Sequence, residues 1–194
     1  MTFSQQINML FAQEEWAKAR RLLERRLAKE PDNHWLLTRL GTTYYEQQDY
    51  EKALGFSQKA FQIAPHCPLV LFDLASTLEM LGEDAQAVKI YAKLFQRGVK
   101  GVAEEECGEG VVWARSLLAD CLYSVAGCQH RLEHHEQAMW FIQLHLEWRA
   151  RGAKSIYSVK EARERLREIA GPSLSAVFEN ETGEAGKMLD LVEA

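Results

Sequence analysis

The stretch WLLTRLGTTYYEQQDYEKALGFSQKAFQIAP, residues 35–65, holds the pattern that decides the fold. Its apolar residues recur three and four positions apart, beginning with Leu37, Leu40 and Tyr44, and this is the spacing of one face of an α-helix. The polar stretch EQQD interrupts the pattern, and Pro65 stops its second half. The stretch therefore predicts two consecutive helices joined by a tight turn.

The same pattern returns along the chain at a fixed interval. Ala19, Ala53 and Ala87 are each separated by 34 residues, and so are Pro31 and Pro65. A period of this length is typical of solenoids, in which each helical pair stacks on the next one. Because small residues let two helices approach closely, the alanines are expected at helix contacts. The period therefore predicts an all-α repeat fold.

The middle copy resembles the tetratricopeptide repeat, whose pattern is W-x2-L-G-x2-Y, then A-x3-F, then P. Leu37 stands at the Trp position of that pattern and Ser57 at the Phe position. The remaining positions match in Leu40, Gly41, Tyr44, Ala53 and Pro65. The resemblance extends from residue 1 to about residue 98. It implies a right-handed α-α superhelix, a solenoid of about four helix-turn-helix repeats closed by a C-terminal capping helix.

The register of the repeats predicts how the chain is organised. We expect one domain over residues 1–170, and an inserted loop over residues 99–110, where glycines and acidic residues crowd. The expected parts of the domain are repeats over residues 1–33, 34–67, 68–98 and 111–152 and a capping helix over residues 158–170.

The C-terminal part carries its own signals. Ser158 and Glu161 have the spacing of a capping box, which predicts where the last helix begins. Gly171 followed by Pro172 is expected to end that helix. The acidic tail, residues 171–194, is expected to be either mobile or docked on a surface.

The composition excludes several classes of protein. A net charge of −5 and a pI of about 5.7 argue against a nucleic-acid-binding surface, which needs clustered Lys and Arg. The N-terminal region lacks the basic and apolar runs of a signal peptide, and no run of about 18 apolar residues appears, so neither export nor membrane insertion is expected. Four cysteines without a C-x-x-C pair favour reduced thiols and a cytoplasmic location.

The resemblance implies a non-enzymatic protein-interaction module without a cofactor. Neither a phosphate-binding loop nor a nucleophile elbow appears in the sequence, and we expect no catalytic residues. In tetratricopeptide proteins the first helices of successive repeats line a concave groove that binds the partner. The matching positions here are Asn8, Phe11, Trp35, Thr38, Thr42, Tyr45, Leu69, Phe72, Ser76, Glu79, Trp113, Ser116, Asp120 and Tyr123.

Four aromatic residues stand out in this set. Trp35 and Trp113 share one repeat position, and Tyr45 and Tyr123 share another. Aromatic side chains offer large contact areas at low entropic cost and dominate binding hot spots. The alternative is that some of the four belong to the core, because helical spacing serves both purposes.

The expected groove does not match one known subclass of the family. That subclass binds acidic C-termini through a clamp of Lys, Asn and Arg. The matching residues here are Ser4, Asn8, Arg39, Leu69 and Asp73, of which only Asn8 agrees. Since Asp73 has the wrong charge for the clamp, the pattern favours an apolar or amphipathic peptide, or a helix of another protein.

The segment HRLEHHEQAMW, residues 130–140, is the best candidate for a metal site. His130 and His134 are four residues apart, which would place both imidazoles on one helix face. No third and fourth ligand completes a known motif. The favoured interpretation is therefore a lengthened turn between the two helices of the fourth repeat, with His145 further on as a core or interface residue.

The sequence thus predicts a protein or peptide partner, without nucleic acid or membrane insertion. A chaperone or scaffold for complex assembly is the more specific form of this hypothesis. Two alternatives stay open. One is a homo-oligomer, such as a homodimer, with the tail in the groove, and the other is a metal-binding protein that uses His130 and His134.

Overall fold

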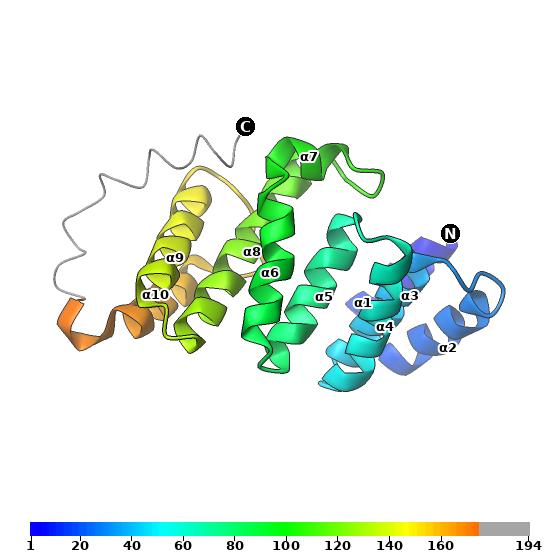
Figure 1. Cartoon of the computed structure of the whole chain (residues 1–194). Coiled ribbons are helices and arrows are strands. Elements are labelled where there is room, and N and C mark those ends of the chain that lie inside the picture. The colour runs from blue at the N-terminus through cyan, green and yellow to red at the C-terminus, as the bar shows by residue number, and fades with distance from the viewer. Residues whose placement is uncertain (175–194) are drawn as a thin grey trace. The chain divides into compact units, whose positions relative to one another are not determined.

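The computed structural model describes residues 1–174 (Figure 1). This part of the chain contains ten α-helices and no strand, which confirms the predicted all-α class. Two compact units make up the chain, Met1–Leu81 and Gly82–Ala194. Residues 175–194, which hold most of the predicted acidic tail, lie outside the described residues.

The first unit consists of five helices. Three of them begin at a polar cap: Thr2 forms a capping box with the third helical residue, and Asn33 and Asp49 each accept a backbone N–H through the side chain. The helices are α1 (Phe3–Ala12), α2 (Trp16–Leu27), α3 (His34–Tyr45), α4 (Tyr50–Ile63) and α5 (Pro68–Met80).

Small residues let the helices of the first unit pack closely. A Cβ atom on Gly41 would lie 3.4 Å from Ser57 Oγ and 3.5 Å from Phe56 Cβ, so α3 and α4 nearly touch there. Ala19 and Ala53 are fully buried, as the period predicts. One cluster of the core between these helices is made of Ile7, Leu23, Leu36 and Leu40.

The turns between paired helices share one backbone conformation. Glu14, Gln48 and Gly82 have φ angles of 55°, 61° and 77°, and they are 34 residues apart in sequence. Glu133, in the turn after α8, has a φ angle of 62°. The repeat period is therefore present in the backbone itself. Of these positions only Gly82 has the residue that adopts a left-handed conformation without steric cost.

We predict that Gln48→Gly raises the free energy of unfolding by about 0.5–1 kcal/mol, because glycine relieves the steric cost of the left-handed φ angle. The Gln48 side chain is exposed, so little contact area is lost. Urea unfolding followed by circular dichroism measures the effect. Gly82→Gln is the matched reverse change, and a Cβ there meets no atom within 4 Å. Its expected effect is a loss of stability, and a gain would contradict the argument.

The described residues of the second unit, 82–174, form five further helices. They are α6 (Asp84–Phe95), α7 (Gly98–Glu104), α8 (Val111–Arg131), α9 (His135–Ala150) and α10 (Val159–Leu174). By length and composition α8 is apolar enough to cross a membrane, but 72% of its 18-residue apolar window is buried inside the structure. It is therefore placed as a core helix of this unit. One core cluster contains Tyr123, Ala126, Ala138, Met139, Ile142, Ala162, Ile169 and Ala170.

An ion pair joins the start of α6 to the end of α8. The Nη2 atom of Arg131 donates to Asp84 Oδ1 at 2.7 Å, and its Nε atom lies 3.1 Å and 3.0 Å from the two carboxylate oxygens. Asp84 is 7% exposed. A carboxylate this deeply buried requires such a partner, because an unpaired buried charge is strongly destabilising.

The expected loop over residues 99–110 is partly wrong. Residues 98–104 form α7, in which Val99 and Val102 are buried. These side chains lie three residues apart on one helix face, and their burial outweighs the low helix propensity of the glycines around them. Only residues 105–110 remain irregular.

The expected lengthened turn before α9 is wrong as well. Only residues 132–134 separate α8 from α9. The additional residues of this repeat lie partly within α8, which has 21 residues where α3 has 12, and partly before it, in α7 and residues 105–110. Burial of apolar side chains along most of α8 explains why the helix continues so far.

The capping box predicted at the start of the last helix is present, whereas Gly171 kinks α10 and does not end it. The Ser158 N–H donates to Glu161 Oε2 at 2.7 Å, and the Glu161 N–H donates to Ser158 Oγ at 3.2 Å, which completes the capping box. Gly171 has a φ angle of 63° and interrupts the helical path of α10. Glycine tolerates this left-handed angle, so the break falls where the sequence places it.

Candidate functional site

In the first unit, α1, α3 and α5 carry the residues that the sequence places in a binding groove. Arg39 lies on α3 and Asp73 on α5, so both are counted together with these residues. Asn8 is exposed and Thr38 is buried, while the others keep part of their surface exposed. We call this set the first-helix face of the first unit: Asn8, Phe11, Trp35, Thr38, Arg39, Thr42, Tyr45, Leu69, Phe72, Asp73, Ser76 and Glu79.

Arg39 lies beside two aromatic side chains of this face. Its guanidinium carbon is 5.5 Å from the ring centroid of Phe11 and 5.5 Å from that of Trp35. Cation–π contacts of this length orient the side chain without using its N–H donors. Arg39 is the only Lys or Arg on α1, α3 and α5. Among residues 1–174 no hydrogen bond or ion pair engages its guanidinium.

Asp73, on α5, is the acidic group that Arg39 attracts. Burial raises the pKa of Asp73 to about 7, although the positive charge of Arg39 lowers it. Near neutral pH the carboxyl group is therefore divided between its protonated and its ionised form. Asp73 consequently neutralises Arg39 only in part, and the guanidinium keeps its capacity to bind another acceptor.

Other predicted residues of this face have different surroundings. Thr38 is 7% exposed, and its Oγ1 atom has no hydrogen-bond partner among the described residues. Its carbonyl oxygen accepts the Thr42 hydroxyl at 3.0 Å. The Tyr45 ring meets the Tyr50 ring edge-on, with 5.3 Å between centroids. Thr38 is thus buried under the face, whereas Thr42 and Tyr45 keep part of their surface exposed.

The corresponding face of the second unit is different. Trp113 and Ser116 are half-buried on α8, and the Ser116 hydroxyl donates to Val112 O at 3.1 Å. Asp120 and Tyr123 are only 7% exposed each. This differs from the expected open groove, and for Tyr123 it agrees with the alternative of a core residue.

A segment between α9 and α10, residues 153–158, covers Asp120 and Tyr123, and we call it the strap. The Ser155 hydroxyl and the Ile156 N–H both donate to Asp120 Oδ1, at 2.5 Å and 3.0 Å. The Tyr157 ring stacks on Tyr123 with 3.8 Å between centroids. Burial raises the pKa of Asp120, and these hydrogen bonds oppose the rise. Part of the expected binding face is therefore occupied by the chain itself.

The strap residues could not be found from the repeat pattern. Ser155 and Tyr157 follow the last predicted repeat, where no position of the 34-residue pattern applies. Their partners are more than 30 positions earlier in the chain. Only tertiary contacts bring these residues to α8.

The structure does not place His130 and His134 on one helix face, which is the geometry that the metal-site alternative needs. His130 lies in the last turn of α8, and His134 precedes α9. Between them Glu133 takes a left-handed φ angle of 62°, which turns the chain. The neighbour of the His130 ring is His135, with 5.4 Å between centroids. His134 Nδ1 lies 2.8 Å from Gln129 Oε1.

His145 is a core residue, in agreement with the sequence. It is fully buried, and its Nδ1 atom donates to Ala119 O at 2.7 Å. Burial lowers its pKa, so the neutral imidazole is the form held in the core. The side chain thus connects α9 to α8 rather than facing a ligand.

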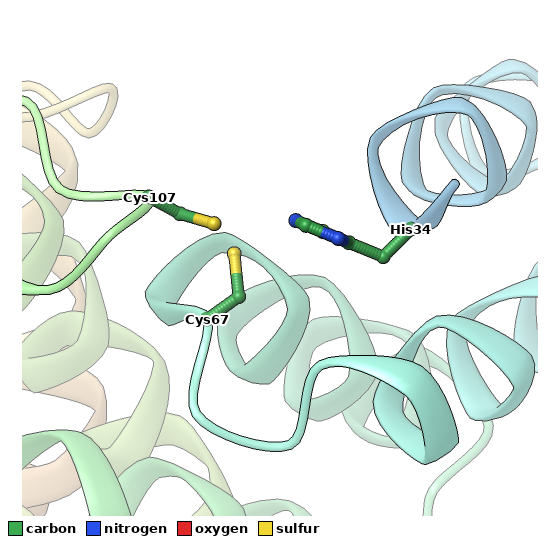
Figure 2. A group of neighbouring side chains, drawn as sticks. All are labelled: His34, Cys67 and Cys107. Carbon is green, nitrogen blue, oxygen red and sulfur yellow. The ribbon is translucent and has the colours of Figure 1, made fainter. Parts of the chain in front are cut away.

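Figure 2 shows His34 and Cys67, two side chains of the first unit that point toward one another. A nitrogen of His34, at the start of α3, and the sulfur of Cys67, just before α5, lie within 4.8 Å. Cys107, drawn in the same figure, belongs to the second unit. Zinc sites take three or four protein ligands, and the first unit supplies two at this position.

The repeats have counterparts in a known family. Residues 10–57 and 44–100 match a family model described as a tetratricopeptide repeat. Residues 10–100 are tetratricopeptide repeats. This result agrees with the paired helices, the buried repeat alanines and the recurring left-handed turn residues.

A solved structure extends the comparison from the repeats to the fold of the chain. The MamA RS-1 ArsTM double mutant is 14% identical, with a TM-score of 0.65 over 98% of this chain and 90% of that one. The C-terminal part of a tetratricopeptide repeat-containing protein from Cytophaga hutchinsonii is 15% identical, with a TM-score of 0.40 over 87% and 79% of the two chains. No curated protein matches this chain.

The family defines the general role of the fold. Tetratricopeptide repeats are typically non-enzymatic modules that mediate protein–protein interaction, and the fold supports such a role here. Which face is used, and for what kind of segment, depends on the side chains described above.

Proposed function

We propose that the chain is a non-enzymatic module that binds a segment of a partner protein on the first-helix face of the first unit. One observation carries the proposal: Arg39 lies 5.5 Å from each of the Phe11 and Trp35 rings and makes no hydrogen bond or ion pair within residues 1–174. A guanidinium donates to a carboxylate or carbonyl oxygen, whereas aromatic rings contact apolar groups. An amphipathic partner segment satisfies both.

The contrast between the two units supports this choice of face. In the second unit the strap covers Asp120 and Tyr123. In the first unit Phe11, Trp35 and Arg39 keep part of their surface exposed. A partner would therefore meet an open face on the first unit without first displacing any of residues 1–174.

The aromatic contacts also lower the cost of binding. Trp35 packs edge-on against Phe3 at 6.3 Å, and Phe11 packs against Trp16 at 5.2 Å, measured between ring centroids. Side chains that are already ordered lose less entropy when a partner binds. A chaperone or scaffold that holds a partner during assembly is the more specific form of this proposal.

The test is the charge reversal Arg39→Glu. We expect at least a tenfold loss of each partner captured by the wild-type protein, because a charge-assisted hydrogen bond contributes about 1.5–3 kcal/mol. Quantitative mass spectrometry of proteins retained on immobilised variants measures the loss. Circular dichroism checks the fold, which should persist because Arg39 has no hydrogen bond or ion pair in the described residues to lose.

Arg25→Glu is the matched control. Arg25 is exposed on α2, outside the first-helix face, and the substitution changes the net charge by the same amount. It should keep the partners. The proposal is wrong if folded Arg39→Glu retains every partner, or if both variants lose the same partners equally.

A further inference from the structure

The strap contacts α8 through both side-chain and backbone groups, as a bound peptide contacts a receptor. Asp120 accepts the Ser155 hydroxyl at 2.5 Å and the Ile156 N–H at 3.0 Å. The Ser155 Oγ atom in turn accepts the Tyr157 N–H at 3.0 Å. One carboxylate thus binds both a side-chain hydroxyl and a backbone amide of the same short segment, and charge-assisted bonds of this kind are strong and directional.

The aromatic side chain of the strap has a separate contact site. Tyr157 stacks on Tyr123 with 3.8 Å between centroids and 19° between ring planes, and its hydroxyl lies 3.3 Å from Ser124 Oγ. The Arg165 guanidinium carbon is 3.9 Å from the same Tyr123 centroid. Two groups this close to one ring occupy opposite faces of it. The strap therefore covers one face of Tyr123, and α10 covers the other.

The attachment of α10 does not depend on the strap. Ala162 and Ile169 of α10 are buried in the core cluster of the second unit, and Arg165 donates to Tyr123 O at 3.1 Å. In the strap, Ile156 is 72% exposed and contributes only its backbone N–H to the contact. The strap is bounded by Gly152, with a φ angle of 93°, and by the capping box that begins α10. Its release leaves the apolar docking of α10 in place.

We propose that the strap is a displaceable internal ligand of α8. When the strap is released, the same face binds a short segment of another protein that has a hydroxyl side chain two residues before an aromatic one. The strap defines this chemistry, because its Ser155 hydroxyl and Ile156 N–H donate to Asp120 and its Tyr157 ring stacks on Tyr123. The inference rests on the proposed function in one respect, because both assume that the first helix of a repeat binds the partner. It concerns other residues in the other unit, so either can fail alone.

The strap is covalently connected to α9 and α10, and this connection explains why the site is occupied when no partner is present. A ligand held by short connections has an effective concentration in the millimolar range. A free segment with the same contacts therefore competes poorly with the wild-type strap. Weakening the strap without changing Asp120 or Tyr123 removes this competition and leaves the receptor side intact.

The experiment uses the full chain and an acetylated, amidated peptide AKSIYS, which copies residues 153–158. Binding to the wild-type protein and to Ser155→Ala/Tyr157→Ala is followed by amide chemical shifts in nuclear magnetic resonance. We expect the peptide to bind the double variant at least tenfold more tightly, with the largest shifts at Tyr123 and Ser124. Adding Asp120→Asn to the double variant should weaken binding at least fivefold.

Two controls distinguish peptide binding at the strap site from a general loss of structure in the variant. Tyr157→Phe keeps the stacked ring and should bind the peptide as weakly as the wild-type protein does. A peptide AKAIAS, which lacks the hydroxyl and the ring, should not bind the double variant. Equal binding of AKSIYS to the wild-type protein and the double variant would overturn the proposal, and so would a folded double variant that does not bind it.

A second variant keeps the test valid if the first one does not fold. Ile156→Pro removes the N–H that Asp120 accepts and fixes the local φ angle, while little side-chain contact is lost because the Ile156 side chain is largely exposed. Hydrogen exchange should then become at least tenfold faster in residues 153–158, while amides of α10 near Ala162 and Ile169 keep their protection. Loss of protection in α10 to the same degree would show that the strap is a fixed part of the fold and would overturn the proposal.

Discussion

Replacing Asp73 by asparagine is expected to stabilise the protein at pH 8 and to leave its stability at pH 4 almost unchanged. Burial raises the pKa of Asp73 to about 7, from an ordinary value of 3.8. Between these two values the folded state holds a proton that the unfolded state has lost. The free energy of unfolding of the wild-type protein therefore falls as pH rises through this range.

The size of this effect follows from the pKa difference. At about 1.4 kcal/mol per pKa unit, a difference of about three units sets an upper limit of about 4 kcal/mol. Since Asp73 keeps part of its surface exposed, we expect Asp73→Asn to gain about 2–4 kcal/mol at pH 8. Asparagine has nearly the same shape as the protonated acid, so little changes at pH 4. Urea unfolding at pH 4, 6 and 8 measures the gain.

Asp49→Asn is the matched control, with the opposite sign. The hydrogen bond from the Lys52 side chain lowers the pKa of Asp49. Its ionised form therefore contributes stability above the ordinary pKa, and this contribution is lost as pH falls. Asparagine keeps the N-cap of α4 but not the charge, so the variant should gain nothing at pH 8. A gain for Asp73→Asn that is the same at every pH would contradict the buried carboxyl group.

Arg131→Met is expected to lower the free energy of unfolding by about 2–3 kcal/mol. Methionine keeps the apolar stem of the side chain but leaves the buried carboxylate of Asp84 without the guanidinium that pairs with it. Removing one partner of a buried pair costs up to about 3–5 kcal/mol. The expected loss is smaller because 42% of the Arg131 side chain is exposed and Asp84 lies at the start of α6, where the helix dipole favours a negative charge.

A double-mutant cycle measures the pair itself. Asp84→Asn removes the buried charge, so Asp84→Asn/Arg131→Met should be more stable than the sum of the single losses implies. Lys160→Met is the control for an exposed pair, since Lys160 lies 3.9 Å from Glu164 at the surface. Its expected effect is within about 0.5 kcal/mol. Additive losses in the cycle would show that the Asp84–Arg131 pair contributes no coupling.

Local packing explains why the repeats could be predicted from the sequence. Each helical pair contacts mainly its neighbours in the chain, so small and apolar residues recur at the positions where helices touch. Ala19, Ala53 and Ala87 are all fully buried. The capping box of Ser158 and Glu161 is likewise a contact between residues three positions apart. Short-range features of this kind leave a direct trace in the sequence.

The binding face could be predicted only in part. The sequence places Phe11 and Trp35 on the first helices, and the structure leaves both partly exposed beside Arg39. It also places Asp120 and Tyr123 on a first helix, but the strap covers them there. Nothing in the helical spacing of α8 distinguishes an open position from one that a later segment of the chain covers.

The sequence by itself determined the helical pairs, their 34-residue period and the family, because these depend on contacts between residues close in the chain. The tertiary structure alone decided that the last pair has a long α8 and a short turn, and that the strap covers Asp120 and Tyr123. It also decided the environment that raises the pKa of Asp73. These features depend on burial and on contacts between distant residues, such as the 35 positions that separate Asp120 from Ser155.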